Sequence, residues 1–408
     1  MTINKTKNNP PGFFRSWRLY RQFKKVPRSE KSILFYAESG QDWHHFAPII
    51  HHLTEHLGER VCYVSSDPDD PVFSQKNERI TSFFMREGLF QILFFSHLNA
   101  DILVLTMLDL HNFHLKRSVN PVHYIYLFHA MGSTHMVDFA DSYDHYDTIF
   151  CVGPHQKEEI RRREQLKGFP PKNLVEHGYA RVDALMEKNR EDVKSPLSKE
   201  GTTVLLAPTW GDKSILNTCG LELCGILLTA GFNLILRPHY ETVKRTPQVT
   251  ENILKKYGRH EAFAYVDRMG DTDSLFRSDL LISDWSSMSI EYALGLEKPV
   301  LFIDVPRRVR NQAYMELGVE PAEVRIRKEV GEILDPNELE KAPSMIKNML
   351  AGRDRFKENI DTIRRRYLYN PGESAQIGAM EIRRIKERFI GKRGSKEHDA
   401  SPPLTENR

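Results

Sequence analysis

Short apolar segments alternate with helical patterns over most of this chain. In the first half, five segments rich in β-branched and aromatic residues have the composition of buried strands: Ile33–Tyr36, Val61–Val64, Ile102–Leu105, His123–Phe128 and Thr148–Val152. Helical patterns are predicted at Trp43–Leu57, Phe73–Glu87 and Pro154–Lys167. Strands that alternate with helices form a parallel sheet covered on both faces. The pattern therefore predicts a doubly wound α/β domain.

The second half of the chain repeats this architecture without a short sequence repeat. Its predicted strands are Thr203–Ala207, Asn233–Leu236, Ala264–Val266, Leu280–Ser283 and Val300–Ile303, with helices near Leu221–Thr229, Asp273–Arg277 and Ser287–Leu294. Beyond Pro336 the chain is helical and basic, over Arg353–Arg366 and Glu373–Phe389. The predicted fold class is α/β, with two doubly wound Rossmann-like domains that face each other across a cleft and a helical C-terminal segment.

Changes of composition divide the chain further. We expect a basic aromatic N-terminal segment (residues 1–31), a first Rossmann-like domain (32–186), a polar linker (187–201), a second Rossmann-like domain (202–370), a helix that packs back toward the first domain (371–390) and a disordered tail (391–408). This division is consistent with the length of 408 residues, which favours two domains.

The overall composition excludes several classes of protein. An apolar content of 40% with 28% charged residues is typical of a globular protein, and a net charge of +3 gives no argument for nucleic acid. The four cysteines form no close Cys-x-x-Cys pair, so neither a disulfide framework nor a zinc site is predicted. No apolar run reaches the roughly 20 residues that span a bilayer, and no signal peptide is visible. We expect a cytoplasmic protein without a metal.

The charge is concentrated at the N-terminus. Residues 1–29 contain eight basic side chains and no acid, interleaved with five aromatic side chains: Phe13, Phe14, Trp17, Tyr20 and Phe23. On a helix, Phe13, Trp17 and Tyr20 share one face, and such a segment can lie in the headgroup region of an anionic membrane. The alternative is a solvated basic arm whose aromatic side chains pack on the first domain. The membrane interpretation predicts a peripheral protein at the inner face of the cell membrane.

Polar residues that could take part in catalysis or ligand binding directly follow the predicted strands. His129, followed by the small residues Gly132 and Ser133, comes after a strand of the first half. In the second half, Thr209 and Trp210 follow one strand, and Arg237 and His239 follow the next. Because ligands of doubly wound sheets bind at the carboxyl ends of strands, His129 and His239 are candidate catalytic residues. By contrast, His44, His45, His51, His52 and His56 share one predicted helix, and we interpret them as structural.

The segment from Asp279 to Pro299 is the most informative part of the chain. A short apolar strand ends at Ser283-Asp284, and a helix is predicted to begin at Ser286 and Ser287. The unpaired amides and the dipole at a helix N-terminus attract phosphate. Glu291 follows one turn later, within reach of a diol attached to that phosphate. The alternative is that Ser286 only caps the helix.

Taken together, these motifs resemble the bacterial glycerophosphotransferases that use CDP-glycerol to build teichoic acid and capsule polymers. The resemblance covers roughly Val122 to Ile303. It rests on the His129 turn, Ala207-Pro208-Thr209-Trp210, Leu236-Arg237-Pro238-His239 and Ser283-Asp284-Trp285-Ser286-Ser287 with Glu291 following. The chain departs from the family where Phe128-His129-Ala130 replaces Trp-His-Gly, Ser-Asp-Trp-Ser-Ser replaces Thr-Asp-Tyr-Ser-Ser, and Tyr240 replaces the proline after the histidine.

The resemblance implies a glycosyltransferase-B type fold and transfer of glycerol phosphate, or a similar polyol phosphate, from a CDP-activated donor to a hydroxyl of a lipid-linked or saccharide precursor of a surface polymer. His129 and His239 would be catalytic. The first domain would bind the acceptor and the second the nucleotide donor. The donor would be held by Thr209, Trp210, Arg237, Ser283, Asp284, Ser286, Ser287 and Glu291, with Gly132 and Ser133 on the acceptor side. No cofactor is implied. The alternatives are a nucleotide-sugar glycosyltransferase or sugar-nucleotide epimerase of the same fold, and a non-catalytic membrane-bound scaffold.

Overall fold

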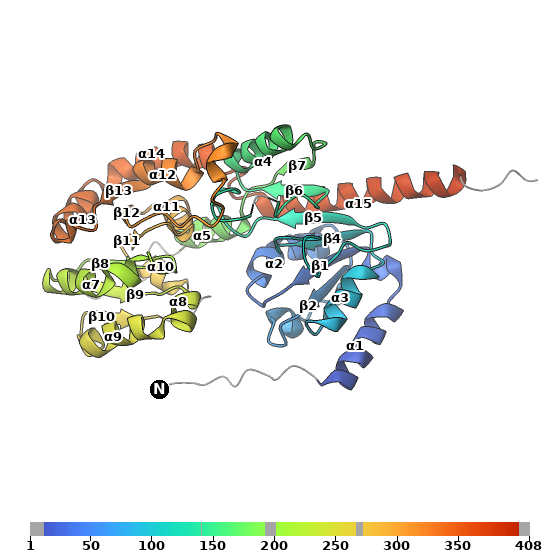
Figure 1. Ribbon diagram of the computed structural model, residues 1–408, viewed down its shortest axis with the longest axis horizontal. Coiled ribbons are helices and arrows are strands. Elements are labelled where there is room, and N and C mark those ends of the chain that lie inside the picture. The colour runs from blue at the N-terminus through green and yellow to red at the C-terminus, as the bar shows by residue number, and fades with distance from the viewer. Residues whose placement is uncertain (1–11, 140, 192–200, 267–271, 400–408) are drawn as a thin grey trace, which may run out of the picture.

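The molecule contains two parallel sheets that lie side by side, each with helices on both faces (Figure 1). The computed structural model describes residues 12–139, 141–191, 201–266 and 272–399. The two-domain α/β fold predicted from the sequence is confirmed.

The first sheet has seven parallel strands in the order β3-β2-β1-β4-β5-β6-β7. These strands are β1 (Ile33–Ala37), β2 (Val61–Ser65), β3 (Ile80–Phe84), β4 (Ile102–Leu105), β5 (His123–Leu127), β6 (Thr148–Cys151) and β7 (Asn173–Glu176). Its interior strand β1 is buried along its whole length because both faces of the sheet are covered there. One face packs against α2 (Trp43–His51), the π-helical turn η2 (His52–His56) and α15 (Ser374–Asp399).

The other face of this sheet packs against α1 (Phe13–Lys25) and α3 (Leu89–Ser96). Helix α4 (Pro154–Lys167) packs against β6, and α5 (Ala180–Glu191) contacts α2 and α15. Two 3-10 turns, η1 (Arg28–Lys31) and η3 (Pro71–Ser74), complete the first domain.

The second sheet has six parallel strands in the order β10-β9-β8-β11-β12-β13. They are β8 (Thr203–Leu206), β9 (Asn233–Leu236), β10 (Phe263–Tyr265), β11 (Leu280–Ser283), β12 (Val300–Ile303) and β13 (Gly331–Leu334). The helices around it are α6 (Ile215–Thr218), α7 (Gly220–Thr229), α8 (Tyr240–Arg245), α9 (Pro247–Tyr257), α10 (Asp273–Arg277), α11 (Met288–Leu296), α12 (Ala322–Val330), α13 (Ala342–Ala351) and α14 (Arg353–Tyr367), with 3-10 turns η4 (Tyr314–Leu317) and η5 (Leu339–Lys341).

The two domains share one continuous apolar core. Helix α5 of the first domain packs on α11 of the second, and Leu185 and Leu294 belong to the same buried cluster. A Cβ at Gly295 would lie 2.9 Å from the Leu185 Cβ atom, so a glycine allows the two helices to approach closely. After α14 the chain crosses back, and α15 packs on α2 and η2 of the first domain (Figure 1).

The structure corrects several predicted boundaries. The predicted helix at Phe73–Glu87 is wrong: the segment forms the end of η3 and the edge strand β3. Polar residues 75–79 interrupt any helical apolar stripe, and the β-branched and aromatic residues that follow pair with β2. Helix α5 continues through residue 191 and α15 through residue 399, so the predicted linker and tail both begin too early. Residues 192–200 and 400–408 lie outside the described part.

The strands β7 and β13 were not predicted. Both have only four residues and are partly exposed at the sheet edges, so their sequences lack an apolar run. Gly331 shows how closely β13 approaches its neighbour, because a Cβ there would lie 1.7 Å from the carbonyl oxygen of Val300.

Candidate active site

Each sheet reverses its strand order at one point, and two candidate segments of the second domain follow the strands on either side of its reversal. In the first sheet the reversal lies between β1 and β4, and in the second between β8 and β11. Thr209 follows β8, and the Ser286 turn follows β11. Ligands of doubly wound sheets bind in the crevice beside such a reversal. The topology therefore marks both domains as ligand-binding.

His129 lies just beyond the end of β5 with an exposed side chain. Its Nδ1 atom is 3.4 Å from the Tyr126 hydroxyl, whose ring packs against Tyr143. The Tyr143 hydroxyl donates a short hydrogen bond to Asp138. Burial raises the pKa of Asp138, while the Tyr143 hydroxyl and the charge of His129 act in the opposite direction. His129 is thus oriented by a tyrosine pair that ends in a carboxylate.

His45, which the sequence analysis assigned to the structural histidines, is a neighbour of His129. The two ring centroids are 6.0 Å apart, and His45 stacks on Tyr179 at 5.9 Å. Burial, the positive charge of His129 and that of Arg181 lower the pKa of His45 to about 3. His45 therefore stays neutral beside His129. No sequence pattern indicates this contact, because only the fold brings α2 beside the end of β5.

Tyr179 and Arg181 connect His129 with the second domain. The Tyr179 hydroxyl donates to the backbone oxygen of His129 at 2.8 Å and lies 3.3 Å from Glu291 Oε1. Arg181 Nε is 2.7 Å from Glu291 Oε2. Glu291, which the sequence analysis placed beside a donor diol, is therefore buried and bound to the first domain in this structure.

The turn after β11 has the geometry of a helix N-terminus. Ser287 is the N-cap residue of α11, and both Ser286 and Ser287 are half-buried. The N–H groups of Ser289 and Ile290 already donate to the backbone oxygens of Ser286 and Ser287 at 3.1 and 3.0 Å. An anion at this helix start would therefore interact with the helix dipole and with the N–H groups that precede Ser289. Ser289 closes the turn by donating to the Ser286 backbone oxygen at 2.6 Å.

The two residues before this turn support it rather than face a ligand. The Ser283 hydroxyl donates to the Ala207 backbone oxygen at 2.8 Å, and Ser283 is fully buried. Asp284 accepts the backbone N–H groups of Thr209 at 2.7 Å and Ile215 at 3.2 Å. Both side chains thus fasten the loop after β8 to the turn after β11.

His239 begins α8 as its N-cap. Its Nδ1 atom accepts the backbone N–H of Glu241 at 3.1 Å. Burial and the charge of Arg308 lower the pKa of His239 to about 4, with Glu241 acting in the opposite direction. In the neutral ring the proton must then lie on Nε2. His239 therefore presents a neutral N–H donor.

A stack of cationic and aromatic side chains lies beside His239. The Trp210 ring is 6.2 Å from the His239 ring, with the guanidinium of Arg308 at 4.1 Å and that of Arg245 at 5.0 Å from its centroid. Arg308 Nη1 also donates to the Thr209 hydroxyl at 3.4 Å. Arg237 is buried at the end of β9.

Arg308 was not predicted as a site residue, although the sequence contains a signal for it. The basic run Arg307-Arg308-Val309-Arg310 begins four residues after the end of β12, at the edge where ligands of such sheets bind. This segment also crosses between the domains: Arg310 lies 4.8 Å from the ring of Phe139. Burial lowers the pKa of Arg308, whereas the negative charges of Asp284 and Asp138 raise it. The charges of both Arg308 and His129 act on Asp138, which lies in the first domain.

Gly132 and Ser133, predicted on the acceptor side, lie at an interdomain contact instead. The Ser133 backbone N–H donates to Glu323 Oε2 at 3.0 Å, and its hydroxyl accepts the Ala322 N–H at 2.6 Å. A Cβ on Gly132 would meet Glu323 at 3.3 Å. This pair therefore caps the start of α12 and fixes the two domains together.

A cavity of about 680 Å³ opens beside His129 in the first domain. Carboxylates from the loops after β1 and β4 line it, together with α3 and His129. It lies at the strand-order reversal of the first sheet, between β1 and β4.

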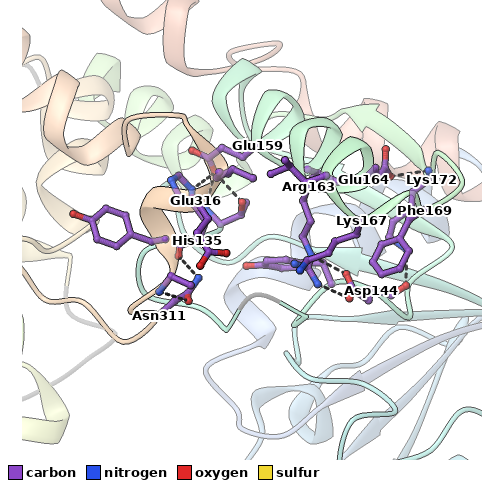
Figure 2. A pocket seen from close by; sticks show the side chains of 17 residues that line it. His135, Asp144, Glu159, Arg163, Glu164, Lys167, Phe169, Lys172, Asn311 and Glu316 are labelled. Carbon is purple, nitrogen blue, oxygen red and sulfur yellow. Dashed lines mark hydrogen bonds and ion pairs between the residues drawn. The ribbon is translucent and has the colours of Figure 1, made fainter.

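A second pocket, of about 180 Å³, lies between α4 and η4 (Figure 2). His135 and Glu159 face each other at 3.4 Å, and Arg163 pairs with Asp144 at 2.6 Å. Glu159 is fully buried and also accepts the Thr134 N–H at 2.7 Å. None of the candidate residues predicted from the sequence lines this pocket.

Neither a metal cluster nor a membrane span emerges from the described residues. Those residues contain no group of three or more His, Cys, Asp or Glu side chains suited to a metal ion. Among the helices described, none combines the length and apolar composition needed to cross a bilayer.

Comparison with known proteins decides the family. A family model described as CDP-Glycerol:Poly(glycerophosphate) glycerophosphotransferase matches residues 19–320. The chain belongs to this family. Among curated proteins, the teichoic acid poly(glycerol phosphate) polymerase of Bacillus spizizenii is 28% identical over 206 residues, which are 47% of this chain and 49% of that protein. The chain thus spans about half the length of this glycerophosphotransferase relative.

Solved structures share the fold. The wall teichoic acid polymerase TagF is 17% identical with a TM-score of 0.55, covering 92% of this chain and 95% of that one. A putative UDP-N-acetylglucosamine 2-epimerase from Listeria monocytogenes is 13% identical with a TM-score of 0.54, covering 85% and 94%. At these identities the likeness shows the fold alone, and it agrees with the glycosyltransferase-B type architecture expected from the sequence.

Proposed function

We propose that this family member transfers glycerol phosphate, or a similar polyol phosphate, from a CDP-activated donor to an acceptor hydroxyl, with release of CMP. The acceptor oxygen forms a new bond to the phosphorus next to the polyol. The bond from that phosphorus to the bridging oxygen of the diphosphate breaks, and the bridging oxygen leaves with CMP. Such transfer requires positioning and charge stabilisation more than covalent chemistry from the protein.

The observation that carries this proposal is the cationic and amide-rich surface at the reversal point of the second sheet. Arg308, the neutral Nε2–H donor of His239 and the start of α11 gather there, and all three suit a diphosphate. We assign donor binding to these groups together with Ser286, Ser287, Thr209 and Trp210, and to Arg237 behind them.

His129 would act on the acceptor. Its exposed ring borders the cavity in the first domain, so it can accept the hydroxyl proton as the new bond forms. His239 would donate its Nε2 hydrogen to the reacting phosphate or to the leaving CMP. In this assignment Ser283, Asp284 and Glu291 position the loops and the domains.

The family match favours this reaction over the two alternatives. A nucleotide-sugar glycosyltransferase or an epimerase of the same fold would release or re-form a nucleoside diphosphate, whereas this reaction releases CMP. A non-catalytic scaffold would need neither the His129 cavity nor the His239 cluster.

The test is incubation of the purified protein with CDP-glycerol, other CDP-polyols and nucleotide sugars, each with a lipid-tailed hydroxyl acceptor. We expect CMP and an acceptor heavier by one polyol phosphate, measured by chromatography and mass spectrometry. Release of UDP from a nucleotide sugar, without CMP from any CDP-polyol, would refute the proposal.

We further propose that the protein is peripheral at the inner face of the cell membrane. The Tyr20 and Phe23 side chains of α1 are buried against the first domain, which is what the packed-arm alternative expected. Phe13, Phe14 and Trp17 on the same helix remain exposed, however, at 53%, 86% and 44%. Aromatic side chains beside basic ones suit an anionic lipid surface.

A further inference from the structure

We propose that the acceptor of this transferase is an uncharged saccharide hydroxyl, and that the growing end of a poly(glycerol phosphate) chain is a poor acceptor. This inference rests on the proposed function and specifies the ligand of the cavity beside His129. It predicts that the enzyme adds the first polyol phosphate to a sugar, although the curated relative is described as a polymerase.

The location of the cavity identifies it as the acceptor site. It lies at the strand-order reversal of the first sheet, between the loops that follow β1 and β4. His129 forms part of its wall. An acceptor that occupied this space would therefore lie against the base that receives its proton.

The charge of the cavity disfavours a polyanion. Glu38, Asp42, Glu87 and Asp109 all line it, and the described lining residues include neither lysine nor arginine. These carboxylates influence one another: burial, and then the charges of Asp42 and Glu87, raise the pKa of Glu38 to about 7, although part of its side chain faces solvent. Each phosphodiester of a polyol phosphate chain would add a negative charge to this field.

The region of the second domain that we assign to the donor carries the opposite charge. The guanidinium groups of Arg308 and Arg245 lie 4.1 and 5.0 Å from the centroid of the Trp210 ring in this region. A chain of phosphodiesters would be attracted there and would compete with the donor diphosphate. The enzyme thus separates an anionic donor from an acceptor site that favours neutral hydroxyls.

The remaining walls of the cavity suit a sugar ring. Carboxylates accept hydrogen bonds from sugar hydroxyls, and Gln91 and Thr106 add further polar groups. At the rim, Ile92 and the 65% exposed Phe113 offer an apolar surface for the C–H face of a ring. The exposed Leu89 and the α1 helix continue this apolar surface, because Phe13 and Trp17 contact Phe90 of α3.

The experiment compares two synthetic acceptors that carry the same short lipid tail. One ends in a neutral disaccharide and the other in an oligo(glycerol phosphate). With CDP-glycerol as donor at low salt, we expect kcat/KM for the disaccharide to exceed that for the oligo(glycerol phosphate) by at least about tenfold. Added salt should reduce this ratio because it screens repulsion.

A charge-removing variant tests the cause. Glu87→Gln with Asp109→Asn should raise kcat/KM for the oligo(glycerol phosphate) and reduce the ratio to about threefold or less. Asp109 has a φ of 61°, a conformation that asparagine also tolerates, so the fold should be retained. The matched control, Glu222→Gln with Glu251→Gln, removes two exposed acids from the second domain and should leave the ratio unchanged. Glu87→Gln alone gives a second, milder variant.

The outcomes separate this inference from the proposed function. Equal or faster transfer to the oligo(glycerol phosphate), with CMP released, overturns the acceptor assignment and leaves the transferase intact. An unchanged ratio in both cavity variants, when they fold and bind donor, overturns the electrostatic cause and with it the inference. Failure to release CMP with any acceptor overturns the proposed function itself.

Discussion

Arg181 and Glu291 form an ion pair of 2.7 Å that joins the two domains beside the candidate catalytic histidine. Glu291 is only 7% exposed, whereas Arg181 is 27% exposed. The negative charge of Glu291 raises the pKa of Arg181 despite its burial. Tyr179 contacts both Glu291 and the backbone of His129, so the pair also fixes the position of the base.

Removing Arg181 should destabilise the protein. Arg181→Met leaves a buried carboxylate without its cation, so we expect the free energy of unfolding to fall by about 2–4 kcal/mol. The double variant with Glu291→Gln should recover part of that loss, as measured by urea unfolding in a double-mutant cycle. Arg365→Met removes a 78% exposed arginine and should change stability by no more than about 0.5 kcal/mol. Equal, small losses in both arginine variants would contradict the prediction.

Replacing each of the two candidate catalytic histidines should cause a different defect. We expect His129→Ala and His239→Ala each to lower turnover by at least about 100-fold, the usual scale for loss of a proton-transfer group. His239→Ala should also weaken donor binding and slow the hydrolysis of the donor by water, because we propose that its Nε2–H binds the donor phosphate. His129→Ala should bind donor normally. Steady-state kinetics and calorimetry measure both effects, with the exposed His260→Ala as control; identical defects in both variants would argue against separate roles.

Arg308 should contribute more than charge to donor binding. Its guanidinium lies 4.1 Å from the Trp210 ring and donates to Thr209. Lysine keeps the charge but loses the planar stacking and the forked donors. We therefore expect Arg308→Gln to weaken CDP-glycerol binding by about 10- to 100-fold, with Arg308→Lys intermediate. Calorimetric titration of each variant checks this, and Arg259→Gln serves as the exposed control. Unchanged affinity in Arg308→Gln would remove Arg308 from the donor site.

The sequence was sufficient for the central strands because their apolar, β-branched composition is dictated by burial on both faces. Strands β1, β8 and β11 show this directly. Strand β3 was mistaken for part of a helix because an edge strand needs no continuous apolar run. The positions of His129, His239 and Ser286 followed from a rule about strand ends, which holds whenever the strands are correctly placed.

Roles that depend on contact between distant segments could not be predicted. Ser283, Asp284 and Ser133 carry polar groups at strand ends, yet in the structure they bind backbone groups and fix loops. His45 was dismissed because its neighbours in sequence are uninformative, while its neighbours in space are His129 and Tyr179. Such assignments depend on packing, for which a single sequence contains no local signal.

Membrane attachment should depend on the exposed part of α1. Deleting residues 1–29 would also remove the buried Tyr20 and Phe23, so that variant would lose stability. Replacing Phe13, Phe14 and Trp17 by serine avoids this. We expect the triple variant to lose binding to vesicles that contain phosphatidylglycerol, which co-sedimentation measures. Its far-UV circular dichroism spectrum should stay unchanged, because the substituted side chains are exposed. The matched control replaces the exposed Leu221, Met315 and Met380 by serine. If both triple variants bind vesicles equally, α1 has no membrane role.

The buried His177 should make the docking of α15 sensitive to acid. It packs 5.1 Å from the Phe150 ring, and a Cβ at Gly378 of α15 would lie 2.7 Å from its Nε2 atom. Burial lowers the pKa of His177 to about 4 from the usual 6.5. Because the unfolded chain takes up a proton near pH 6.5 and the folded chain does so only near pH 4, stability is lost as pH falls through this window.

The loss from His177 can reach about 3 kcal/mol by pH 4, at 1.36 kcal/mol for each unit of pKa difference. His177→Leu keeps an apolar contact and removes the titration, so its free energy of unfolding should fall less steeply between pH 6.5 and 4 than that of the unmodified protein. The stability of this variant should still depend on pH, because His45 and His239 also have lowered pKa values in the folded protein. Urea unfolding at several pH values measures the slope, and the exposed His260→Leu should match the unmodified protein. Parallel curves for His177→Leu and the unmodified protein would show that His177 is not the group that titrates.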